Sequence, residues 1–354
     1  MAQSPRIASL FGIDIELHWL SVVFLLLFLL LSVYLFLLML LLLASVLLHE
    51  LAHSVTSLHN KVKVSKIILI LPIGGMSVLD DTNIDPKVEF NIALAGPVMS
   101  LLLGAFFGIF VAFTPPGLVT QVFQFMFEIN ILLGILNLLP AFPTDGGRVF
   151  RSWLERKRDK YTATMITVKT SKATMGLIVI ATIFYLFAIN ASFAYKEMLF
   201  VITLFTIFFL YGGAEAEQQM ATLRRNATGI SVKSAISKDF AFITPQASIK
   251  EIYNKIKKSK KHVIITKIGN EYAYVNVFDR RRLENARNAA DLAVKVPNVS
   301  IKTNIVDVMS MMENRESAIA CIINKGKLEG VVSAQHLEAF ITLHVVQKKH
   351  NAHR

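Results

Sequence analysis

Cysteine and charge are both scarce in this sequence. Cys321 is the single cysteine among 354 residues, so no disulfide can form within the chain, and the redox compartment stays open. Charged residues make up 18% of the chain, whereas soluble globular domains carry about 25%. Together with 54% hydrophobic residues and a mean hydropathy of +0.52, this deficit indicates a membrane protein.

Motifs for nucleic-acid recognition are also lacking, although the formal net charge is +12. No RNP, zinc-finger or arginine-rich pattern accompanies the charge, so we expect no nucleic-acid partner. Attraction to anionic lipid at a cytoplasmic surface is the simpler explanation. The last third of the chain, Asn226 to Arg354, holds 21 Lys and Arg against 11 Asp and Glu. We therefore expect an apolar membrane domain, 1–225, followed by a basic soluble domain, 226–354.

Long apolar runs predict six membrane crossings. Residues 17–48 are long enough for two crossings, with a break near Ser32 to Tyr34, because each crossing needs about twenty residues. Basic residues cluster after the second and fourth crossings, which places both termini in the cytoplasm by the positive-inside pattern. The expected fold class is a polytopic α-helical protein of the cell membrane. The other four predicted crossings are 88–113, 119–139, 174–189 and 198–211.

A short β element is predicted between the second and third crossings. The stretch Lys63 to Leu79, KVSKIILILPIGGMSVL, is rich in Ile and Val and is interrupted by Pro72, Gly74 and Gly75. This pattern predicts a strand or hairpin at the cytoplasmic membrane surface.

The basic tail contains an internal repeat. ITPQASIKEIYNKI (243–256) and VSIKTNIVDVMSMM (299–312) match in their apolar positions at an offset of 56 residues. A second match pairs HVIITKIGNEYAYVNVFDRRRLE with AIACIINKGKLEGVVSAQHLE. Two tandem repeats of this kind predict a soluble α/β pair that buries a shared core.

A His-Glu-x-x-His pattern, His49 to His53, ends the second predicted crossing. On a helix, residues four apart lie about 40° apart, so both imidazoles face one point with Glu50 beside them. This arrangement binds zinc and supplies a general base. Ionisable residues that border an apolar span are costly without partners or a function. The pattern therefore predicts a Zn²⁺ site rather than two unrelated histidines near the interface.

A catalytic zinc site takes three protein ligands and a water, so a third ligand is needed. His59 completes a metzincin-like spacing, but Thr56 stands where the metzincin glycine lets the chain turn back. On a continued helix His59 would lie about 240° around from His53 and point away. Asp145, in the Pro-Thr-Asp-Gly-Gly segment after the fourth crossing, would lie at the same depth as the histidines. We favour Asp145 over His59, with a structural Asp-Gly-Gly turn as the alternative.

Asn137 ends the fourth predicted crossing and would face inward. Its amide could donate a hydrogen bond to a substrate carbonyl or oxyanion. An interhelical hydrogen bond is an equally good explanation.

Five segments, in order along residues 10–154, resemble the site-2 protease family of intramembrane zinc metalloproteases. They are FGIDIELHW, HELAH, LPIGGM, ALAGPVMS and NLLPAFPTDGGRVFRSWL. By this resemblance the zinc ligands are His49, His53 and Asp145, and the catalytic base is Glu50. The residues it assigns to substrate are Asn137, Gly74 and Gly75.

The tail resembles a CBS-domain pair, a fold that can bind adenine nucleotides or dimerise a chain. At the usual Ser/Thr-x-x-Asp ribose site the two repeats read Asp279 to Arg282 and Ser333 to His336, so neither has the ribose-binding aspartate. We therefore expect weak or absent nucleotide affinity and favour a docking role or a homodimer through the CBS pair.

The resemblance implies an endopeptidase that cleaves transmembrane or membrane-proximal segments of other proteins. Glu50 would deprotonate a zinc-bound water and then protonate the leaving amine. Two alternatives belong to other classes: a metal or ion transporter with a CBS regulatory tail, and a catalytically silent membrane receptor that binds helices. Peptide cleavage that a chelator abolishes and zinc restores would separate the enzyme from both.

Overall fold

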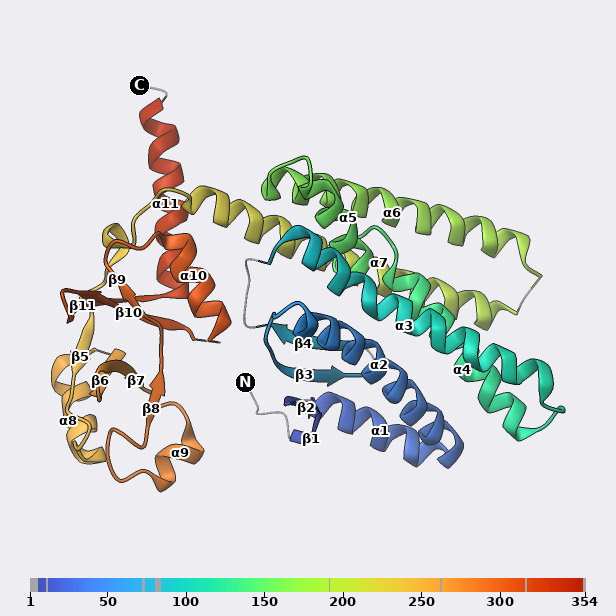
Figure 1. Ribbon diagram of the computed structural model, residues 1–354, viewed down its shortest axis with the longest axis horizontal. Coiled ribbons are helices and arrows are strands. Elements are labelled where there is room, and N and C mark those ends of the chain that lie inside the picture. Colours follow the sequence, from blue (N-terminus) through green and yellow to red (C-terminus); the bar gives the residue numbers. More distant parts are fainter. Residues whose placement is uncertain are drawn as a thin grey trace. The chain divides into compact units, whose positions relative to one another are not determined.

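The computed structural model describes residues 6–10, 12–71, 74–79, 84–190, 192–261, 263–315 and 317–352. The chain forms two compact units, Met1–Ala221 and Thr222–Arg354. Helix α7 (Phe193–Ala227) begins in the first unit and continues past the boundary (Figure 1). The sequence places the division four residues later, and the roles that it gives to the two parts stay predictions.

Six apolar helices dominate the first unit, one for each predicted crossing. Among the described residues, five of these helices are long and apolar enough to cross a membrane, and the first, α1, has 13 residues. Large apolar side chains cover their outer surfaces; Leu30, Phe113 and Phe187 are each more than 80% exposed (85%, 84% and 87%). Exposure of this kind is expected where the solvent is lipid. The helices are α1 (Trp19–Leu31), α2 (Val33–His59), α3 (Pro86–Phe113), α4 (Leu118–Asn137), α6 (Lys160–Ala188) and α7.

Capping residues set several helix boundaries. Ser32 separates α1 from α2, as the sequence predicts, and its hydroxyl accepts a hydrogen bond from the Tyr34 N–H. Asp85 caps α3, where Pro86 takes the first helical position and needs no hydrogen-bond partner. Asp159 caps α6 through the Thr162 N–H.

A four-stranded sheet packs against α2. Its strands lie in the order β1 (Arg6–Leu10), β2 (Ile13–Leu17), β3 (Val64–Ile70) and β4 (Gly74–Leu79). Strands β2 and β3 run parallel, and β3 and β4 form the antiparallel hairpin that the sequence predicts. Two residues of the predicted element, Pro72 and Ile73, lie outside the described residues.

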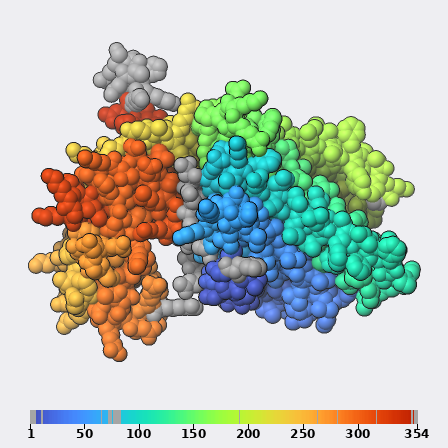
Figure 2. Space-filling view, in the orientation of Figure 1, coloured from blue at the N-terminus to red at the C-terminus, as the bar shows by residue number. Residues whose placement is uncertain are grey.

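Buried side chains fix the sheet onto the helix. Alternate residues of β2 and β3, including Ile13, Ile15, Ile67 and Leu69, are buried in a cluster with Val46 of α2. Because strand side chains alternate between faces, this places one face of the sheet on α2. Helix α3 packs on both α2 and the short helix α5 (Asp145–Glu155). The same order of α2 in blue, α3 in cyan and α5 in green is visible on the surface in Figure 2.

The second unit contains the two predicted repeats. Helices α8 and α10 begin at Ile249 and Ile305, and the hairpins begin at Val263 and Ile319, which is the predicted offset each time. The first sheet has the order β5-β6-β7-β8 and the second β11-β10-β9. The remaining bounds are η1 (Val232–Ala235), β5 (Phe240–Phe242), α8 (Ile249–Ser259), β6 (Val263–Ile268), β7 (Glu271–Val275), α9 (Arg280–Asn285), β8 (Ala293–Lys295), β9 (Asn298–Ser300), α10 (Ile305–Asn314), β10 (Ile319–Asn324), β11 (Lys327–Ser333) and α11 (Ala334–Ala352).

One buried cluster joins the two repeats. It contains Ile265 and Tyr272 from the first repeat, and Ile319, Cys321 and Val331 from the second. Each repeat also has a core of its own. The shared core that the repeat pattern predicts is therefore present, and Cys321 lies within it.

Candidate metal centre

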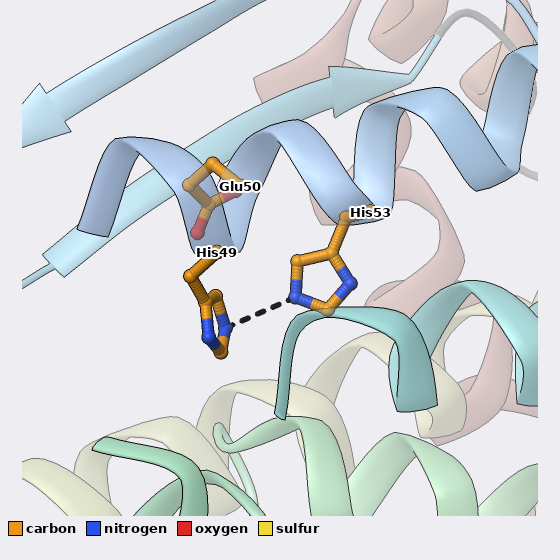
Figure 3. A group of neighbouring side chains, drawn as sticks. All are labelled: His49, Glu50 and His53. Atoms are coloured by element: carbon orange, nitrogen blue, oxygen red, sulfur yellow. Dashed lines mark hydrogen bonds between the residues drawn. The ribbon is translucent and has the colours of Figure 1, made fainter. Parts of the chain in front are cut away.

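Two histidines and a glutamate converge on one face of α2 (Figure 3). His49 and His53 are separated by one helical turn, and their Nε2 atoms lie 3.2 Å apart. The exposed fractions of His49, Glu50 and His53 are only 4%, 8% and 8%. The helix spacing in the sequence therefore predicted the convergence of these side chains correctly.

Asp145, the first residue of α5, completes a triangle with the two imidazoles. Its Oδ2 atom lies 3.1 Å from His49 Nε2 and 3.2 Å from His53 Nε2. Zinc binds histidine nitrogen and carboxylate oxygen at about 2.0–2.2 Å, so ligands at two corners of a tetrahedron lie about 3.4 Å apart. The three side chains thus fit a zinc ion with little adjustment.

The outer nitrogens of both rings are held by α3. His53 Nδ1 donates a hydrogen bond to the Ile92 carbonyl at 2.6 Å, and His49 Nδ1 lies 2.9 Å from Ser100 Oγ. Because a carbonyl oxygen only accepts, the neutral ring of His53 carries its proton on Nδ1 and a lone pair on Nε2. Partners of this kind orient metal-binding histidines and raise their basicity.

Gly96 of α3 lies directly against the two rings, and the sequence reasoning missed it. A Cβ atom at this position would stand 2.2 Å from His53 Nε2 and 2.6 Å from His49 Nε2. Glycine is required here because no other residue leaves room for both imidazoles. The run of small residues Ala95-Gly96 in the predicted third crossing was the available signal, since small residues let membrane helices approach closely.

Gly75 of β4 lies equally close to Glu50. A Cβ atom at Gly75 would stand 2.3 Å from Glu50 Cγ and 2.9 Å from Oε1. Strand β4 is the terminal strand of the sheet order, and its backbone passes beside the carboxylate. Gly74 is the first residue of the same strand.

Two other residues considered from the sequence lie elsewhere. Asn137 is the last residue of α4, and its amide nitrogen donates to the Leu133 carbonyl of its own helix at 3.0 Å. His59 is the exposed last residue of α2. The structure therefore brings together His49, Glu50, His53, Asp145 and Gly75, while the role of Asn137 stays a prediction.

The turn before Asp145 packs tightly against the first residues of α5. Gly146 and Gly147 of α5 lie against the backbone of Leu138, Leu139 and Ala141, where added Cβ atoms would stand 2.3–2.8 Å away. The Phe142 N–H donates to Ser171 Oγ of α6 at 2.9 Å. The prolines and glycines of this segment therefore build a compact turn that fixes the start of α5.

The chain is similar in sequence to known zinc metalloproteases. Residues 37–118 and 116–181 match the model of peptidase family M50. A zinc metalloprotease of Methanocaldococcus jannaschii is 29% identical over 340 residues, which cover 94% of each chain. The solved site-2 protease from that organism is 32% identical, with a TM-score of 0.44 over 61% of this chain and 95% of that chain. For a CBS domain pair/ACT domain protein of Thermotoga maritima, the identity is 17% and the TM-score 0.27, over 32% of this chain and 98% of that chain.

Proposed function

Because the chain belongs to peptidase family M50, the site-2 proteases, it is a zinc metalloendopeptidase of the membrane, and we propose that His49, His53 and Asp145 hold the metal. The observation that supports this ligand set is the convergence of two Nε2 atoms and one Oδ2 atom within 3.2 Å of one another. The hydrogen bonds from the outer ring nitrogens to α3 support it further.

In the proposed mechanism Glu50 is the general base and general acid. A Zn²⁺ ion held by His49, His53 and Asp145 would supply Lewis-acid chemistry at the scissile carbonyl. Glu50 accepts a proton from the attacking water and returns it to the amine that leaves. Its position next to the two histidines on α2 suits this transfer, because the carboxylate lies beside the ligands.

Substrate binding is proposed along β4. A transmembrane helix hides its carbonyls in hydrogen bonds to residues four positions away, so cleavage requires local unwinding. An unwound segment can pair with the terminal strand of a sheet by β-augmentation. Strand β4 offers such an edge, with Gly75 against Glu50 and Gly74 as the first residue of the strand. The side-chain amide of Asn137 is proposed to donate a hydrogen bond to the substrate carbonyl.

The proposed substrates are transmembrane proteins of the same bilayer. The basic segments after the second and fourth crossings favour a cytoplasmic location for both termini. The CBS-like second unit then lies in the cytoplasm, where we propose that it serves docking or dimerisation.

The test compares cleavage by wild-type protein and Glu50→Gln in detergent or liposomes. We expect a chelator to abolish wild-type cleavage and zinc to restore it. Glu50→Gln should keep about one zinc per chain yet lose at least about 100-fold in rate, since general acid–base catalysis contributes that much. A pull-down with this variant would then capture uncleaved substrate.

Near-wild-type cleavage by Glu50→Gln would show that another group is the base. Zinc binding without chelator-sensitive cleavage of any peptide would favour the transporter or receptor alternatives.

A further inference from the structure

One face of α7 packs on the turn that carries Asp145. Leu210 and Ala214 of α7 are buried in a cluster with Ala141 and Phe142 of that turn. On a helix, residues at positions i, i+3, i+4 and i+7 share one face. Leu210 and Ala214 therefore share this face with Gly213 and Glu217.

Gly213 makes the closest of these contacts. A Cβ atom at Gly213 would stand 2.4 Å from Cδ and 2.7 Å from Cγ of Pro143. Pro143 precedes Asp145 by two residues, and the proline ring cannot bend away as a flexible side chain would. The distance between α7 and the turn is therefore set at this point by the absence of a side chain.

Glu217 makes the second contact through a buried arginine. Its Oε2 atom lies 3.0 Å from Arg151 Nη1, on the same helix as Asp145. Arg151 is 8% exposed and also pairs with Glu89 of α3 and with Glu155, the latter at 3.4 Å. Its guanidinium lies 5.4 Å from the centre of the Phe142 ring. Arg151 thus joins α7 and α3 to the helix and turn that present Asp145.

We propose that Gly213 and Glu217 of α7 are positioning residues, which set the distance of Asp145 Oδ2 from His49 and His53. This inference rests on the proposed role of Asp145 as a metal ligand. Because Gly213 and Glu217 contact the turn and the helix that present Asp145, a displacement of α7 at these residues moves the third ligand. The affinity of the metal site therefore depends on a helix that supplies none of its ligands.

The first test uses two adjacent glycines of full-length protein in detergent. Gly213→Ala pushes a methyl group into Pro143, whereas a Cβ atom at Gly212 meets nothing within 4 Å. Both changes give α7 the same gain in helix propensity, so Gly212→Ala is a matched control. We expect zinc to dissociate into excess chelator about tenfold faster from Gly213→Ala, which is the effect typical of losing support for a ligand. Gly212→Ala should match wild type.

The second test keeps the result decisive even if Gly213→Ala does not fold. Glu217→Gln removes the charge that faces Arg151, and Glu215→Gln removes a charge that pairs with Lys172 Nζ at 2.8 Å. We expect severalfold faster zinc loss and an altered visible spectrum of the Co²⁺-loaded protein for Glu217→Gln alone. Glu217→Asp, which keeps the charge, should recover most of the difference.

Equal zinc dissociation in Glu217→Gln, Glu215→Gln and wild type would overturn the proposal. Asp145→Ala distinguishes this failure from a failure of the proposed function. If Asp145→Ala loses zinc while the α7 variants do not, Asp145 is a ligand but α7 does not position it. If Asp145→Ala keeps its zinc, the ligand set itself is wrong.

Discussion

At the scale of single residues, Asp145 contacts both imidazoles with the same oxygen atom. Oδ2 lies within 3.2 Å of each Nε2 atom, so one carboxylate oxygen forms the third corner of the triangle. Two lone pairs and a carboxylate at such distances repel one another unless a positive charge lies among them. The arrangement of these three atoms therefore suits a bound cation.

This arrangement favours Asp145 over His59 as the third metal ligand. We expect His49→Ala, His53→Ala and Asp145→Ala each to lower zinc content from about one per chain to a small fraction, because two ligands hold zinc poorly. His59→Ala should retain its zinc, since His59 is exposed at the end of α2. Metal analysis of the four purified variants checks this. Zinc loss in His59→Ala together with retention in Asp145→Ala would support the metzincin-like ligand set instead.

Sequence reasoning locates the side chains of the candidate site better than the residues that hold them in place. His49, Glu50 and His53 follow from helical spacing alone, because the whole constraint lies within five residues. Gly96, Ser100 and the Ile92 carbonyl belong to another helix. Their contacts depend on how α3 crosses α2, which helical periodicity within one segment does not contain.

At the scale of helices and strands, Gly96 sets the distance between α2 and α3. We expect Gly96→Ala to lose zinc and activity, because its Cβ atom would stand 2.2 Å from His53 Nε2. Overpacking of this kind costs about 1–3 kcal/mol of stability. Gly176→Ala is the control, since a Cβ atom there meets nothing within 4 Å. Zinc content and thermal unfolding measure both effects, and normal zinc binding by Gly96→Ala would contradict the packing argument.

Hydropathy locates the helices but not all of their ends. The predicted crossing at 174–189 is the apolar part of α6, which begins at Lys160. Its first turns hold Thr164, Thr167 and Ser171, whose hydroxyls donate to carbonyls four residues earlier. Likewise, the crossing at 198–211 is part of α7, which extends to Ala227. Backbone hydrogen bonds continue a helix where the apolar pattern has ended, so an apolar window underestimates its length.

At the scale of the whole molecule, the tail is expected to fold on its own and to bind adenine nucleotides weakly or not at all. Residues 230–342, expressed alone, should fold as a soluble unit, because the shared core and all of the repeat cores except Leu223 and Ala227 lie within this range. We expect calorimetry with ATP, ADP and AMP to show no micromolar binding. Asp279 stands at the Ser/Thr position of the ribose motif, and Arg282 stands at its aspartate position. The Asp279 carboxylate accepts a hydrogen bond from the Arg282 N–H and pairs with Arg282 Nε at 3.4 Å. Micromolar affinity for any of the three nucleotides would restore a sensor role.

Because Cys321 is buried between the repeats, its chemical labelling can report when the tail opens. Burial raises the pKa of its thiol to about 12, so the folded protein carries very little of the reactive thiolate at pH 8. Alkylation by a maleimide, or exchange with a disulfide reagent, must then await separation of the two repeats, whose joint core contains this thiol. With a single thiol in the chain, the labelling rate measures that opening without any engineered probe.

The same shift makes the stability of the tail depend on alkaline pH. The folded thiol keeps its proton up to about pH 12, whereas the unfolded thiol loses its proton near pH 9. The buried, protonated thiol therefore makes its full contribution to the free energy of unfolding below pH 9. Above pH 9 this free energy declines by about 1.4 kcal/mol per pH unit. Urea unfolding of the isolated tail should show this steeper alkaline decline in wild type and not in Cys321→Ala. In a cell, an electrophile or oxidant would accordingly react with this membrane protein during those moments when its two tail repeats come apart.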